Sequence, residues 1–164
     1  MLNFLAELTF EKWIIAVIAL IGLAAIVSRL IYRGNLSKRV RDLRPVFYKE
    51  ILNGGKIYAK KSESGCYIIT IYNRKPFESS VNKNKRYSEI YVGQSVNIYK
   101  RVKNHLTGHG NGDVYADVRE GKYVYIRFMP CPEAKMNKLE KSLISLFNAT
   151  KSYNKTRGGS ARRD

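Results

Sequence analysis

An uncharged apolar stretch near the N-terminus constrains this chain more than any other feature. The sixteen residues from Trp13 to Ser28 carry no charge, and the apolar run continues past Arg29 to Tyr32. A helix of about twenty residues rises about 30 Å, which matches the hydrocarbon core of a bilayer. Trp13 and Tyr32 stand at the two ends of the run, where interfacial aromatic side chains are common. The stretch therefore predicts a transmembrane helix over residues 13–32.

A secretory signal peptide and a buried core helix are the two other interpretations of this stretch. A signal peptide begins with a positively charged segment, whereas residues 1–12 contain two acids and one lysine. A core helix that is apolar all round needs a large core to receive it, and 164 residues suffice for one ordinary domain and a short appendage. The membrane interpretation is favoured, with residues 1–12 as a short segment before the span.

The positive charge of the chain is unevenly distributed. The formal net charge is +17, but residues 1–28 carry a net −1, so the rest of the chain carries +18 and favours polyanionic partners. Lys12 alone precedes the span, and six basic residues follow it: Arg29, Arg33, Lys38, Arg39, Arg41 and Arg44. By the positive-inside rule, we expect a single pass through the inner (cytoplasmic) membrane, with the N-terminus outside and the remainder in the cytoplasm.

Residues 33–64 are predicted to form a basic juxtamembrane connector. We expect a short helix that begins near Asn35 or Ser37 and ends before Pro45. A second short helix is expected over 46–52, stopped by the pair Gly54–Gly55. Such a run of charge is usually a solvated spacer, and beside a span it also suits binding to anionic lipid.

From Gly65 onward the pattern predicts an α+β domain. Apolar and β-branched runs predict strands over 65–72, 88–93 and 123–129, and helical spacing predicts helices over 95–106 and 133–149. Residues 73–87 between the first two strands are polar and basic, as in a loop or an irregular hairpin. We expect the domain to cover residues 65–156, with a basic tail at 157–164.

The last predicted helix carries a carboxylate in an unusual position. Its apolar face consists of Met136, Leu139, Leu143, Ile144, Leu146 and Phe147. Glu140 falls inside this face, and a carboxylate directed at a core is costly unless a cation or strong donors meet it. Two interpretations stay open, a residue at the rim paired with a lysine or a ligand for a hard divalent cation.

Arg101 and His105 lie four residues apart on the preceding helix, at the edge of the stripe formed by Ile98, Val102 and Leu106. An ordinary basic helix edge explains them in a chain this basic. The functional alternative is an arginine that binds phosphate beside a titratable histidine.

These residues together resemble a known family. The triplets Gly65-Cys66-Tyr67 and Tyr91-Val92-Gly93 resemble the paired signatures of the GIY-YIG nucleases. The likeness covers about residues 65–156 and continues through Gln94-Ser95, Arg101, His105, Glu140 and Asn154. There are two departures: a cysteine stands where the family usually has isoleucine, and the signature tyrosines are 24 residues apart, with the basic insert 73–87 between them.

The resemblance implies a small α+β domain with a three-stranded, mainly antiparallel sheet flanked by helices, and a role for each matching residue. Glu140 would bind one Mg²⁺ or Mn²⁺, which keeps several water ligands. Arg101 would hold the scissile phosphate, and Tyr67 would act as general base or relay with help from His105.

Three further roles follow from the same resemblance or from the basic helix. Tyr91 would position water or phosphate, and Asn154 would orient Glu140 or the backbone around it. Lys100 and Lys103, with Arg101, are the expected nucleic-acid contacts on their helix.

These observations predict a membrane-anchored, metal-dependent endonuclease that hydrolyses DNA with low sequence specificity, with a role against DNA entering the cell, such as phage genomes. Its partners would be DNA, with RNA left open, and membrane lipids through residues 13–32 and the basic connector. A non-catalytic membrane tether for nucleic acid is the alternative, and a protein of the lipid surface is a third. No protein partner is indicated.

Overall fold

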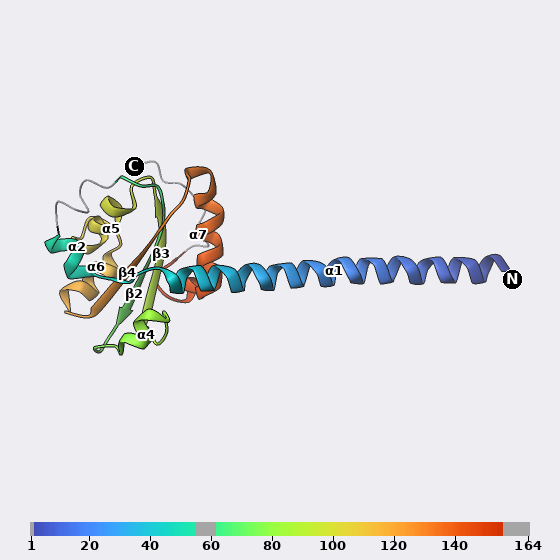
Figure 1. Ribbon diagram of the computed structural model, residues 1–164, viewed down its shortest axis with the longest axis horizontal. Coiled ribbons are helices and arrows are strands. Elements are labelled where there is room, and N and C mark those ends of the chain that lie inside the picture. The colour runs from blue at the N-terminus through green and yellow to red at the C-terminus, as the bar shows by residue number, and fades with distance from the viewer. Residues whose placement is uncertain (1, 55–61, 156–164) are drawn as a thin grey trace. The chain divides into compact units, whose positions relative to one another are not determined.

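The computed structural model of the protein describes residues 2–54 and 62–155 (Figure 1). The tail expected at 157–164 therefore lies outside the described residues. The chain divides into two compact units, Met1–Ser37 and Lys38–Asp164, and each is described by itself.

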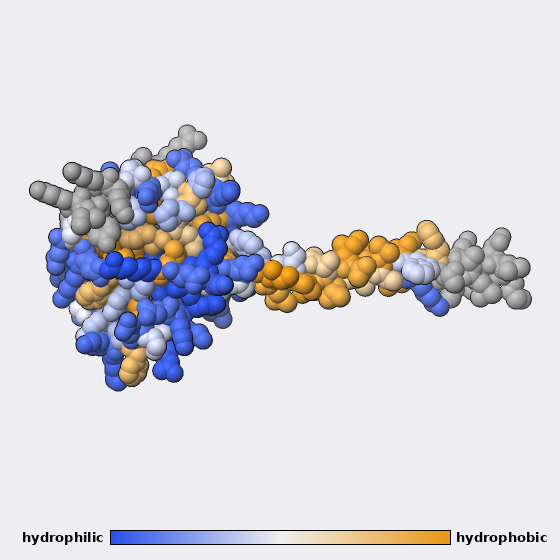
Figure 2. Space-filling model, in the orientation of Figure 1, coloured by the Kyte–Doolittle hydropathy of each residue, from blue (hydrophilic) through white to orange (hydrophobic). Residues whose placement is uncertain are grey.

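The first unit is helical. Helix α1 runs from Leu2 to Asp42 and contains the predicted span 13–32. From Lys12 to Asp42 it is long and apolar enough to cross a membrane, by length and composition. Its large apolar side chains are exposed, with Trp13 at 72% and Leu20 at 66%, and they form an apolar band along the helix (Figure 2). The helix continues without a break into the basic residues where a separate short helix was expected.

The second unit contains one antiparallel sheet with the strand order β1-β4-β2-β3. Strands β2 (Gly65–Tyr72), β3 (Glu89–Ser95) and β4 (Tyr123–Pro130) correspond to the three predicted strands. Strand β2 is buried along its whole length because it lies between β3 and β4 and is covered on both faces. The α+β class and the antiparallel pairing are confirmed.

The prediction of three strands was wrong, because the sheet has four. The fourth is β1 (Val46–Phe47), in which Val46 pairs with Ile126 and Phe47 with Tyr125 of β4. We had expected a helix to begin at Val46, but it begins two residues later as α2 (Tyr48–Asn53). A strand of two residues has no alternating pattern of its own, so only pairing with β4 reveals it.

Helices cover both faces of the sheet. Helices α2, α5 (Ile98–Leu106) and α6 (Gly112–Arg119) lie on one face, and α7 (Glu133–Phe147) lies on the other (Figure 1). The short helix α4 (Glu78–Asn82) follows β2, and the 3-10 turn η1 (Ala149–Lys151) follows α7. The sequence had not indicated α4 or α6 as helices.

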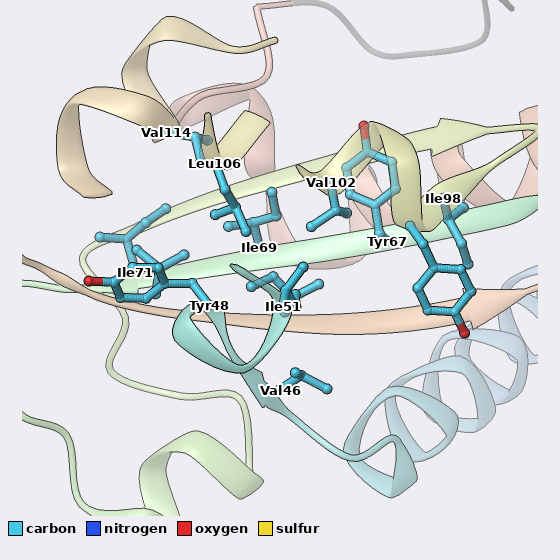
Figure 3. Packing of buried hydrophobic residues seen from close by; sticks show 13 residues of the cluster. Val46, Tyr48, Ile51, Tyr67, Ile69, Ile71, Ile98, Val102, Leu106 and Val114 are labelled. Carbon is cyan, nitrogen blue, oxygen red and sulfur yellow. The ribbon is translucent and has the colours of Figure 1, made fainter. Parts of the chain in front are cut away.

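The main core lies between β2, β4 and the first helix layer (Figure 3). The predicted stripe of α5 is buried there, with Ile98 and Val102 at 0% exposure and Leu106 at 2%. Tyr48 and Ile51 of α2 join the same core. The residues expected to form a connector thus contribute to this unit, and Tyr67 of β2 reaches into the α5 side of it.

Candidate active site

Tyr67 and His105 form the centre of the candidate site. Tyr67 lies on β2 with its ring 1% exposed, and His105 on α5 is also 1% exposed. The Tyr67 hydroxyl and His105 Nε2 are 2.8 Å apart. The ring of Tyr91 lies beside both, with centroid distances of 6.3 Å to Tyr67 and 5.0 Å to His105. The fold therefore brings these three predicted residues together.

A backbone hydrogen bond fixes the tautomer of His105. The Asn111 backbone N–H donates to His105 Nδ1 over 2.6 Å, and a backbone N–H can only donate. Nδ1 therefore carries no proton, and the proton of the neutral ring is on Nε2, which faces Tyr67. His105 donates to the Tyr67 oxygen, so the phenol O–H of Tyr67 is available to an acceptor other than His105.

Burial shifts the pKa of both groups. It lowers the pKa of His105 to about 4, with the nearby Arg101 charge as a second cause, so the ring is neutral at pH 7. Burial also raises the pKa of Tyr67 well above its ordinary value, and the neighbouring Tyr91 adds to this. The Arg101 guanidinium acts in the opposite direction on the Tyr67 pKa, through its charge and through hydrogen bonding. His105 and Arg101 thus both favour the phenolate that burial opposes.

Two glycines leave room for this arrangement. A Cβ on Gly93 of β3 would lie 2.3 Å from the Tyr67 hydroxyl oxygen, so the last residue of the second triplet has to be glycine for Tyr67 to lie where it does. A Cβ on Gly110 would lie 2.4 Å from His105 Nδ1. The glycine-rich loop after α5 therefore packs directly against the catalytic histidine candidate.

Glu140 is buried on α7, at 8% exposure, as the predicted apolar face requires. Gln94, the residue after the second triplet, donates from Nε2 to Glu140 Oε2 over 3.1 Å and to Asn137 Oδ1 over 2.6 Å. These two acceptors fix the orientation of the Gln94 amide. The Glu140 carboxylate also lies close enough to Tyr67 to raise the pKa of that phenol. The acid therefore adjoins the tyrosine cluster.

Asn154 acts on the backbone of β3. It accepts from Val92 N–H over 2.8 Å and donates to Val92 C=O over 2.7 Å, so its amide continues the sheet at the free edge of this strand. Both bonds are to the strand that carries Tyr91 and Gly93, and neither is to Glu140. The role that the resemblance implied for Asn154, orienting Glu140 or the backbone around it, stays a prediction, because the backbone that Asn154 supports is that of β3.

The basic residues of α5 differ in exposure. Arg101 is half-buried beside Tyr67 and His105, whereas Lys100 and Lys103 are exposed. Arg101 is thus placed to bind a group that lies against Tyr67 and Tyr91. Lys100 and Lys103 lie on the same helix and face solvent.

A scan of family models decides what this arrangement belongs to: the GIY-YIG catalytic domain matches residues 63–154, which is more than half of the chain. The chain belongs to the GIY-YIG family. No curated protein and no solved structure matches the chain. The two triplets of the GIY-YIG domain are therefore β2 and β3 residues paired side by side, with Tyr67 opposite Gly93.

GIY-YIG nucleases generally use divalent metal ions, and the residues near Glu140 are compatible with one. Among the described residues no group of three or more His, Cys, Asp or Glu side chains could hold a metal ion. However, Gln94 Oε1 is buried without a hydrogen-bond partner, next to the Glu140 carboxylate. One carboxylate and one amide oxygen suit Mg²⁺, which binds few protein ligands and retains water.

Sequence reasoning missed three parts of the GIY-YIG site. Gln94 was noted in the resemblance but not as a partner of Glu140, and neither Gly110 nor Asn111 was selected. Asn111 could have been found as a helix start, because asparagine is a preferred N-cap residue. In the structure its side chain caps α6 by accepting from the N–H groups of Asp113 and Val114. The bond from its own N–H to His105 is made by backbone and leaves no trace in residue type.

Proposed function

We propose that this GIY-YIG protein is a metal-dependent endonuclease that hydrolyses DNA phosphodiester bonds. The observation that carries the proposal is the buried Tyr67 hydroxyl, which accepts from a histidine of fixed tautomer and lies beside Arg101 and Glu140. A structural tyrosine needs one hydrogen-bond partner, whereas this one has two groups, His105 Nε2–H and Arg101, that stabilise negative charge on its oxygen.

In the proposed mechanism, Glu140 and the Gln94 Oε1 atom would hold the divalent ion. When bound, the ion supplies positive charge to the phosphate and polarises a water molecule. Arg101 binds the scissile phosphate and stabilises the charge that develops on it. Tyr67 first releases its own phenol proton to solvent; as a phenolate stabilised by His105 Nε2–H and by Arg101, it then takes the proton of the attacking water. Tyr91 orients the water or a phosphate oxygen beside them.

Low sequence specificity is part of the proposal. The chain beyond residue 28 carries +18, which gives affinity for any phosphate backbone. Lys100 and Lys103 are exposed beside Arg101, and we assign them to backbone contacts that carry no sequence information.

Plasmid cleavage tests this function directly. The full chain in detergent micelles is incubated with supercoiled plasmid in Mg²⁺, in Mn²⁺ and in EDTA. We expect nicked or linear DNA in the metal buffers, none in EDTA, and loss of cleavage in Arg101→Ala. Arg119→Ala, which removes an exposed arginine of α6, is the matched control and should cleave normally. Binding without cleavage in every buffer would contradict the nuclease and favour a nucleic-acid tether.

We also propose that α1 anchors the protein in the inner membrane with the nuclease domain in the cytoplasm, where it acts on DNA entering the cell. The exposed apolar side chains between Trp13 and Tyr32 support an anchor, and the basic residues after them support the orientation. Deletion of residues 2–32 should release the protein into the soluble fraction and abolish protection against phage while leaving plasmid cleavage intact. Full protection by the released form would contradict this location.

A further inference from the structure

The segment between β2 and β3 forms a pocket outside the catalytic cluster. Its volume is about 300 Å³, and its lining residues run from Tyr72, the last residue of β2, to Ser88 just before β3. Three cationic and three aromatic side chains dominate its lining: Arg74, Lys75, Arg86, Tyr72, Phe77 and Tyr87. Two serines also line it, and within the described part of the chain no acidic side chain does. This composition favours an anion that carries a flat ring.

Tyr72, one of the residues that line the pocket, carries a buried hydroxyl without a hydrogen bond of normal geometry to the part of the chain that the structure describes. Tyr72 is 3% exposed, and its hydroxyl oxygen makes no hydrogen bond among the described residues. The Thr70 hydroxyl is close enough to lower the pKa of Tyr72, but it donates its proton to the Tyr125 carbonyl over 3.3 Å. An unsatisfied buried O–H that lines a pocket is a donor for a ligand, because leaving it without an acceptor costs free energy.

A buried cation supports α4, the helix beside the pocket. Arg127 of β4 is 0% exposed and donates to Val81 C=O, to Asn82 C=O over 3.2 Å and to Asn84 Oδ1 over 2.9 Å. No carboxylate is among the partners of Arg127 in the described residues, and its Nε has no acceptor there. The guanidinium charge is therefore met only by neutral dipoles, so this part of the domain attracts an anion.

We propose that this pocket binds one nucleotide of an unpaired nucleic-acid strand, outside the bond that is cut. The phosphate interacts with Arg74, Lys75 and the Tyr72 hydroxyl, and the base stacks on Phe77. Phe77 is 75% exposed, although a large aromatic side chain gains nothing from solvent, and aromatic rings that bind unpaired strands are exposed in this way. The proposal rests on the proposed function, since both concern the same nucleic acid.

The pocket is separate from the catalytic centre. Tyr67 and Tyr72 are five residues apart on β2, which corresponds to about 17 Å along a strand, and an odd spacing directs them to opposite faces of the sheet. A strand that reaches both sites has to pass around the sheet, which a flexible single strand does more readily than a duplex. A lipid phosphate would use the cations of the pocket but would gain nothing from the exposed ring of Phe77.

The test measures binding of a fluorescein-labelled oligothymidine of about twelve nucleotides. The probe is the oligothymidine alone, in EDTA so that it is not cut, and the protein is the full chain in detergent micelles. Fluorescence anisotropy gives the dissociation constant for Phe77→Leu, which removes the ring, and for Phe77→Tyr, which keeps it. We expect Phe77→Leu to weaken binding about fivefold or more and Phe77→Tyr to bind as the unaltered chain does.

Two matched pairs of basic residues test the phosphate contact. Arg74→Ala/Lys75→Ala removes two cations that line the pocket, and Lys83→Ala/Lys85→Ala removes two exposed cations of the same segment that do not line it. We expect the Arg74→Ala/Lys75→Ala pair to weaken binding more than the other pair. It should also reduce the slope of log affinity against log salt concentration by about 1 for each lost phosphate contact.

Three results would overturn the proposal. Equal affinities for Phe77→Leu and Phe77→Tyr would exclude stacking. Equal affinities for Arg74→Ala/Lys75→Ala and Lys83→Ala/Lys85→Ala would exclude the phosphate contact. If Arg74→Ala/Lys75→Ala loses binding to anionic lipid vesicles but keeps its affinity for oligothymidine, the pocket is assigned to lipid. If the unaltered chain cleaves plasmid in each of these cases, only the pocket fails; if it neither binds nor cleaves DNA, the proposed function fails.

Discussion

The two ends of strand β2 carry buried tyrosines in contrasting surroundings. At one end, the Tyr67 hydroxyl accepts from His105, and His105 is in turn fixed by the Asn111 backbone. At the other end, the Tyr72 hydroxyl makes no hydrogen bond among the described residues. Burial raises the pKa of both phenols, so burial alone does not separate them.

The difference lies in what the protein supplies to each oxygen. The Tyr67 hydroxyl meets donors and a cation that are already in position, as a group needs when it has to gain negative charge during a reaction. The Tyr72 side chain lines the pocket, and its hydroxyl, beside Thr70, has no hydrogen bond of normal geometry within the described part of the chain, as expected of a group whose partner arrives from outside. We infer that one end of β2 is organised for chemistry and the other for binding.

The largest expected effect concerns the carboxylate that only the catalytic end has. Glu140→Gln keeps the size of the side chain and removes its charge, and we expect cleavage to fall about a thousandfold because the proposed metal ion would lose its one carboxylate ligand. The measurement is plasmid cleavage in Mg²⁺. Lys141→Gln alters the next residue of α7, which is exposed, and is expected to cleave normally. Normal cleavage by Glu140→Gln would show that the Glu140 carboxylate takes no part in the reaction.

The next effect concerns stability and pH. In the folded protein the pKa of His105 is lowered from 6.5 to about 4, so the unfolded chain binds more protons between these pH values. Stability therefore falls as the pH decreases from 6.5 to 4, by about 3 kcal/mol from this group. Denaturant unfolding at several pH values measures it, and His105→Gln should lose that part of the pH dependence. The same pH dependence in both proteins would contradict a buried neutral histidine.

A smaller effect concerns the loop that supports His105. In Gly110→Ala the new Cβ would lie 2.4 Å from His105 Nδ1, so the ring or the loop has to move. We expect cleavage to fall about tenfold or more, because small displacements of catalytic groups are costly. Gly112→Ala, two residues further on at the start of α6, is the matched control, since a Cβ there meets nothing within 4 Å. Single-turnover cleavage compares them, and equal rates would show that the fixed position of His105 does not matter.

The smallest effect concerns the unsupported tyrosine. Tyr72→Phe removes a buried hydroxyl that has no partner, so we expect the ligand-free protein to gain about 1 kcal/mol in the free energy of unfolding. Thermal or denaturant unfolding without nucleic acid measures this gain. A loss of similar size would mean that the hydroxyl is satisfied within the protein and would weaken the contrast between the two tyrosines.

The strand and helices that carry this contrast were partly predictable from sequence, whereas the role of Tyr72 was not predicted. Strands 65–72 and 123–129 were identified because runs of β-branched and aromatic residues are strong local signals, and Glu140 because it interrupts an otherwise apolar helix face. Strand β1 was missed because two residues carry no period, and α6 because its glycine-rich start resembles a loop. Local signals thus located the elements but not the pairing between distant ones.

The supporting contacts of the site were beyond the sequence for a different reason. The bond between Asn111 and His105 uses a backbone N–H, which every residue except proline has. Arg127 stands in a strand where an arginine is expected to be exposed, yet it is fully buried because the α4 turn supplies its acceptors. Such contacts depend on tertiary placement, so no pattern along the chain indicates them.

Single-turnover cleavage by Tyr67→Phe and Tyr72→Phe tests the central claim most directly, because the two variants remove the same atom from the two ends of one strand. With a labelled duplex, Mg²⁺ and excess protein, the account predicts a loss of about a hundredfold or more for Tyr67→Phe. For Tyr72→Phe we predict a rate within about twofold of that of the unaltered chain, because the duplex is cut at the end of β2 that carries Tyr67. Equal rates for the two variants would contradict the assignment of chemistry to Tyr67.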